Sequence, residues 1–144
     1  MARPLPELVL FLDECLGSKD VPDALRGAGL HVELLHQHFP AGTSDASWLA
    51  EVGRRGWVVL TKDQRIRFRK SEIDTLLASG VAAFVLSSGG LSGPDMGVAF
   101  VKAYPRMQKF LRDHAPPFVV KVDRRGKLQA FTAAQRRAAQ KKDP

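Results

Sequence analysis

Three aspartates occupy positions where a parallel α/β fold would bring them together. Asp13 ends one apolar run, Asp45 follows a Gly-Thr-Ser sequence at the start of an amphipathic segment, and Asp63 lies just beyond a second apolar run. In open parallel sheets the carboxyl ends of the strands lie at one edge, where ligands bind at the topological switch point. Carboxylates gathered there repel one another unless a cation lies between them, and Mg2+ favours oxygen ligands. The sequence therefore predicts a metal-dependent hydrolase.

A cationic segment lies directly beside the third of these acids. Residues 62–70, Lys-Asp-Gln-Arg-Ile-Arg-Phe-Arg-Lys, hold five cations against one acid. Cations attract and position a phosphodiester backbone, and arginine is suited to bidentate phosphate contacts. A metal-activated water would then hydrolyse the scissile bond. We therefore expect four substrate-binding side chains in this segment: Lys62, Arg65, Arg67 and Arg69.

Size and composition indicate one soluble domain. With 144 residues, 44% of them hydrophobic, the chain can bury an ordinary core, and no apolar stretch has the length of a membrane span. The absence of a signal-like segment and a single cysteine, Cys15, suit a reducing cytoplasm. Of the net charge of +7, residues 123–144 carry +5. We expect a domain over 1–130 and a basic tail over 131–144, which could bind nucleic acid or an acidic partner or be merely solvated.

The apolar runs and breakers alternate as strand and helix, which favours an α/β fold. The expected architecture is a three-layer α/β/α domain with a mainly parallel, five-stranded sheet. Pro105 should kink or split the last helix. The expected strands cover 8–12, 31–35, 57–61, 81–86 and 118–122, and the expected helices cover 20–28, 45–55, 71–79 and 94–114.

The residues singled out as functional candidates also have purely structural explanations. Asp45 and Asp63 could serve as helix or turn caps, whereas a buried Asp13 without a partner would be costly. Cys15 could be a nucleophile, but a structural thiol is favoured. His36 and His38 could form a transition-metal pair in a strand, but loop or substrate contacts are preferred. We expect core roles for Trp48 and Trp57, and a flexible connection for Gly89, Gly90 and Gly93.

Three motifs in this order resemble the compact PIN-like domains, relatives of the VapC-type toxin ribonucleases. The motifs are Phe-Leu-Asp-Glu at 11–14, Thr-Ser-Asp-Ala-Ser-Trp-Leu at 43–49 and Val-Val-Leu-Thr-Lys-Asp at 58–63. The resemblance covers residues 8 to 87 well. It implies a PIN-like fold that cleaves RNA with Mg2+ or Mn2+. Asp13, Asp45 and Asp63 would be the catalytic and metal-binding acids.

The chain departs from the family pattern at one position. PIN nucleases usually have a further acid, often glutamate, between the first and third of these residues, and no single residue here fills that place. Glu14 and Asp20 lie nearby in sequence, and Glu33 would lie within a strand. We retain Glu14 as a candidate fourth metal ligand.

The resemblance implies an RNA substrate and an antitoxin protein as partners, with no membrane association and with a homodimer left open. Two other functions remain open from the sequence. A receiver-like signalling domain also gathers acids around Mg2+, with Asp63 as the phosphate acceptor. A catalytically silent module could bind RNA or protein through its basic surfaces while the acids cap helices.

Overall fold

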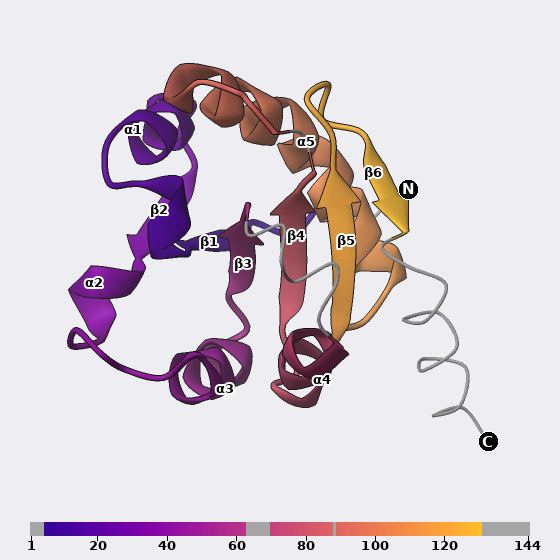
Figure 1. Ribbon diagram of the computed structural model, residues 1–144. Helices are drawn as coiled ribbons and strands as arrows, with labels where there is room; N and C mark the ends of the chain where they lie inside the picture. The colour runs from indigo at the N-terminus through magenta and orange to yellow at the C-terminus, as the bar shows by residue number, and fades with distance from the viewer. Residues whose placement is uncertain (1–4, 63–69, 88, 131–144) are drawn as a thin grey trace.

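The computed structural model describes residues 5–62, 70–87 and 89–130 and shows a sheet with helices on both faces (Figure 1). Neighbouring strands follow the order β2-β1-β3-β4-β5-β6, and every pair is parallel except β5 with β6. The predicted three-layer, mainly parallel architecture is confirmed. The strands are β1 (Val9–Leu12), β2 (His31–Leu34), β3 (Val58–Thr61), β4 (Ala82–Leu86), β5 (Phe118–Val122) and β6 (Leu128–Ala130).

The helices divide into two layers, each packed on its own hydrophobic cluster. Helices α1 and α5 cover one face of the sheet, and α3 and α4 cover the other (Figure 1). Alternate residues of each central strand point to opposite faces, so both faces of the sheet are buried. The helical elements are η1 (Glu14–Leu16), α1 (Asp20–Gly27), α2 (Leu35–His38), α3 (Asp45–Arg55), α4 (Lys70–Ala78) and α5 (Gly93–Asp113).

Helix α3 has the predicted bounds because local signals define both of its ends. Ser44 is the N-cap, and its Oγ accepts a hydrogen bond from the Ser47 amide at 3.2 Å. Gly56 ends the helix in the left-handed region at φ 72°, where glycine is favoured. Between these ends the helix buries Trp48 on the sheet. The position of Asp45 at the first helical residue is therefore set by its neighbours in sequence.

Three features differ from the sequence-based expectation. The sheet has a sixth strand, β6, which pairs antiparallel with β5. The segment after β2 forms the short helix α2 rather than continuing as a strand or loop. Helix α5 is not split at Pro105, which is exposed, because Ala103 and Met107 on either side are fully buried and keep one helix on the sheet. The predicted tail lies outside the described residues.

None of the helices in the described part of the chain offers an apolar stretch of membrane-spanning length.

Candidate active site

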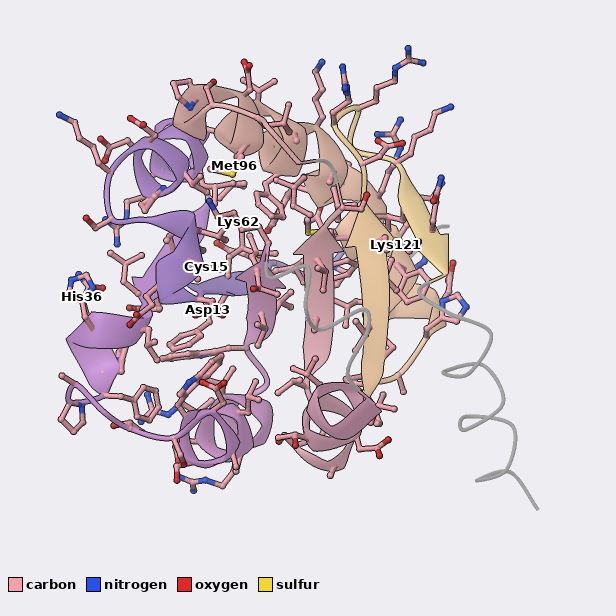
Figure 2. All side chains as sticks on the ribbon, in the orientation of Figure 1. Asp13, Cys15, His36, Lys62, Met96 and Lys121 are labelled. Atoms are coloured by element: carbon pink, nitrogen blue, oxygen red, sulfur yellow. The ribbon has the colours of Figure 1, made fainter. Side chains whose placement is uncertain are left out.

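The strand order creates a switch point between β1 and β3. The chain leaves β1 toward β2 on one side and returns through α3 to β3 on the other side. Connections on the two faces therefore diverge at the carboxyl ends of these neighbouring strands, which is where open α/β sheets bind ligands. Asp13 directly follows β1, Asp45 begins α3, and Lys62 directly follows β3. Figure 2 shows Asp13, Cys15 and Lys62 in this one region.

Asp13 is held at the end of β1 by contacts with β3. Its backbone amide donates to the Leu60 carbonyl at 3.1 Å, which extends the pairing of the two strands by one residue. The Thr61 hydroxyl donates to Asp13 Oδ2 at 3.2 Å. Although Asp13 precedes the 3-10 helix η1, its side chain makes no capping hydrogen bond there. The side chain is therefore oriented by the neighbouring strand.

Burial raises the pKa of the Asp13 carboxyl above its ordinary value. The hydrogen bond from Thr61 lowers this pKa, the negative charge of Asp45 raises it, and weaker interactions with the amides of Glu14 and Cys15 lower it. The effect of Asp45 shows that the two carboxylates lie close enough to repel each other. Two of the three predicted acids thus lie in one region, and the negative charge of Asp45 makes Asp13 more costly to ionise.

Thr61 connects the two chain segments of the site. At 1% exposure it is the buried polar residue of the described part of the chain. Besides its bond to Asp13, its Oγ1 lies 3.3 Å from Cys15 Sγ. Cys15 is half-buried and contacts this hydroxyl, which agrees with the structural role expected for it. A buried hydroxyl is tolerated here because it has hydrogen-bond partners.

Asp45 is positioned by a contact that the sequence analysis did not identify. Its Oδ1 accepts a hydrogen bond from the Trp48 indole at 3.1 Å. The sequence did carry a signal for this contact, because Asp45 and Trp48 are three residues apart and residues at i and i+3 are neighbours on a helix. Since Ser44 supplies the N-cap, the helix does not need Asp45 for capping. An acid in the first turn of α3 still benefits from the helix dipole.

The remaining predicted residues are distributed around this pair. Glu14 is exposed in η1, Asp20 is exposed at the start of α1, and Lys62 is exposed after β3. Among the described residues, no three histidine, cysteine or acidic side chains form a group that could hold a metal ion. Four predicted site residues lie in the segment 63–69, outside the part of the chain that the structure describes: Asp63, Arg65, Arg67 and Arg69.

Glu33 and the histidines form a separate cluster. Glu33 Oε1 lies 2.9 Å from His31 Nε2, and its Oε2 lies 2.9 Å from His38 Nε2. These hydrogen bonds, the one from His38 first, lower the pKa of Glu33. His38 also packs edge-on against Trp57, with the ring centroids 5.0 Å apart. Glu33 is therefore occupied by histidines, and His36 projects from α2 away from Asp13 (Figure 2).

A magnesium or manganese ion fits the donor chemistry of the Asp13 and Asp45 pair. Both groups offer carboxylate oxygens, and their repulsion would be relieved by a cation. Mg2+ is usually bound through one or two carboxylates together with waters and substrate phosphates, so two acids are sufficient in number. Lys62 adds a positive charge beside them. Such an arrangement is suited to phosphodiester chemistry.

Comparison with known proteins shows which proteins this chain resembles. The family model described as "PIN like domain" matches residues 8–88. A curated protein of Mycobacterium tuberculosis named "Putative ribonuclease VapC45" is 25% identical over 111 residues, which cover 74% of this chain and 80% of that protein. No solved structure matches the chain significantly.

The raised pKa of Asp13 predicts the pH dependence of an Asp13→Asn variant. A folded pKa above the unfolded value means that ionised Asp13 costs stability at neutral pH, and that this cost disappears as the pH falls through the folded pKa. Without metal, Asp13→Asn should therefore melt on the order of a few degrees higher than wild type at pH 7. The difference should shrink on acidification, as measured by thermal denaturation across pH.

Asp113→Asn is the matched control, because Asp113 is exposed at the opposite end of the fold. Its melting difference from wild type should not follow this pH course. If Asp13→Asn melted below wild type at pH 7, or if its gain in melting temperature did not depend on pH, the Asp13 carboxylate would not be destabilised by burial and repulsion as described.

Proposed function

The chain belongs to the PIN-like domain family, and we propose from this premise that it is a metal-dependent endoribonuclease. The observation that carries the proposal is the pairing of Asp13 with Asp45 at the switch point, where burial and mutual repulsion both raise the pKa of Asp13. Each carboxylate accepts a hydrogen bond, from Thr61 or from Trp48, and a cation between the two acids would relieve their repulsion. The name of the mycobacterial relative supports RNA as the substrate.

The side chains of this site have distinct roles in the proposed mechanism. Asp13 and Asp45, with Asp63, would hold Mg2+ or Mn2+, and Glu14 is the candidate for a further ligand. When bound, the metal supplies an activated water and stabilises negative charge on the scissile phosphate. Thr61 keeps the Asp13 carboxylate oriented through its 3.2 Å hydrogen bond, and the Trp48 indole does the same for Asp45 at 3.1 Å.

Cations complete the proposed substrate site. Lys62 follows Thr61 directly and is exposed, so its ammonium group can contact a phosphate next to the acids. Arg65, Arg67 and Arg69 follow in sequence and remain proposed phosphate contacts. No contact in the described residues favours the receiver-like alternative, whose phosphate acceptor would be Asp63.

Cleavage of RNA tests the enzymatic proposal. Wild-type protein should cut unstructured RNA internally with Mg2+ or Mn2+ and not with chelator. Asp13→Asn and Asp45→Asn should each lower the rate at least about 100-fold, since each removes a metal ligand. Cleavage products are resolved on denaturing gels under single-turnover conditions.

Asp113→Asn again serves as the control and should cut like wild type. Chelator-resistant cleavage, or full activity in both site variants, would reject the metal-dependent mechanism. RNA binding without cleavage under any of these metals would instead favour the silent binding module.

We also propose that the protein is the toxin of a toxin–antitoxin pair. An unrestrained RNase would damage its own cell, so a separate inhibitor protein is expected. Induced expression in a bacterial host should arrest growth, whereas Asp13→Asn should not. Co-expression of a small protein encoded beside this gene should restore growth, and the two proteins should purify together. Equal growth with wild type and an empty vector would contradict the toxin role.

A further inference from the structure

The turn between β5 and β6 is fixed against helix α5. Asp123 Oδ1 accepts hydrogen bonds from the amides of Arg125 at 2.8 Å and Lys127 at 2.9 Å. Gly126, at φ 79°, donates its amide to the Asp123 carbonyl at 2.9 Å. A Cβ on Gly126 would lie 2.8 Å from the backbone nitrogen of Ala103, so glycine permits this close approach to the helix. The turn therefore holds a defined position on the fold.

Four cations extend from the end of β5 and its turn, and we call them the β5-end surface: Lys121, Arg124, Arg125 and Lys127. Lys121 is half-buried and the other three are exposed. Asp123 is the acid within this stretch, and its carboxylate accepts hydrogen bonds from amides of the turn. These hydrogen bonds and the charges of nearby cations lower the pKa of Asp123. In Figure 2, nitrogen-tipped side chains gather over α5 and the β5–β6 turn. The surface is thus strongly positive and held in place.

The β5-end surface lies on the same edge of the sheet as Asp13. Strand β5 runs parallel to β4, β3 and β1, so its carboxyl end shares their edge. Thr61 pairs with Val85, and Val85 pairs with Lys121, so the three side chains stand in one row on the face covered by α3 and α4. Two strand spacings separate Thr61 from Lys121, about 10 Å.

We propose that the β5-end surface binds the RNA backbone beyond the cleaved phosphate and guides the strand along the carboxyl edge of the sheet. The proposal rests on the proposed ribonuclease function. Lys121 contacts a phosphate on the α3 and α4 side of the edge, and Arg124 and Arg125 contact the backbone farther out at the turn. Arginine pairs provide bidentate contacts, and these contacts do not depend on base sequence.

An acidic protein could use the same charges, but the placement favours RNA. Lys121 continues a row that begins at Asp13 and Thr61 and crosses successive strands of the same edge, and the three turn cations follow it beyond the end of β5. A flexible single strand held at the acids can reach the end of β5 within a few nucleotides. Electrostatic attraction to the backbone is one of the interactions, along with aromatic stacking, by which proteins bind single strands without sequence preference.

RNA binding in chelator tests the surface separately from catalysis. Affinity of a fluorescein-labelled, unstructured RNA is measured by anisotropy between about 50 and 200 mM KCl. Arg124→Gln/Arg125→Gln should weaken binding roughly tenfold and flatten the plot of log affinity against log salt by about 1.4. Lys121→Gln alone should flatten it by about 0.7.

The matched control is Arg54→Gln/Arg55→Gln, which removes the same charge at the end of α3. These arginines bind Glu51 at 2.6 and 2.8 Å and lie at the opposite edge of the sheet. Circular dichroism establishes that each variant is folded. The control should bind RNA like wild type, with the same salt dependence.

Equal behaviour of the two arginine pairs, or no RNA binding by wild type, would overturn the assignment of this surface. Loss of binding to an acidic polypeptide with unchanged RNA affinity would assign the surface to a protein partner and also overturn it. Because chelator prevents metal-dependent cleavage, a failed nuclease assay leaves this result unaffected. The two proposals can therefore fail independently.

Discussion

The site depends on the placement of two like charges beside each other at the end of a buried strand. Asp13 loses hydration there, and the charge of Asp45 adds to the cost of ionising it. A single hydroxyl, that of Thr61, donates to the Asp13 side chain from the neighbouring strand. An arrangement that costs stability in the free protein is typical of a functional site, and the proposed cation would offset its negative charge.

The fold provides this placement through its strand order. Since β2 and β3 lie on opposite sides of β1, the connections leaving and entering this region run on different faces. Asp13 and Asp45 approach from the end of a strand and from the start of a helix, respectively. The β5-end surface lies at the same edge of the sheet, and its turn packs against α5. One edge thus combines the acids with Lys62 and with the cations at the end of β5.

Features controlled by neighbours in sequence could be predicted, whereas those that need distant partners could not. Helix α3 was predicted with the right bounds because Ser44 and Gly56 define its ends locally. Strand β6 was missed because its three residues form no apolar run, and its pairing with β5 depends on the turn at Asp123. The bond between Thr61 and Asp13 depends on the register of β1 and β3, which no local pattern reveals.

Binding of Mn2+ in the absence of RNA is the most direct measurement of whether Asp13 and Asp45 share a cation. Free Mn2+ is followed by electron paramagnetic resonance during titration with wild type, Asp13→Asn, Asp45→Asn and Asp113→Asn proteins. Each of the two site variants should weaken binding more than about tenfold, equivalent to about 1.4 kcal/mol, while Asp113→Asn binds like wild type. Unchanged Mn2+ affinity in Asp45→Asn, or no binding by wild type, would contradict a shared metal site.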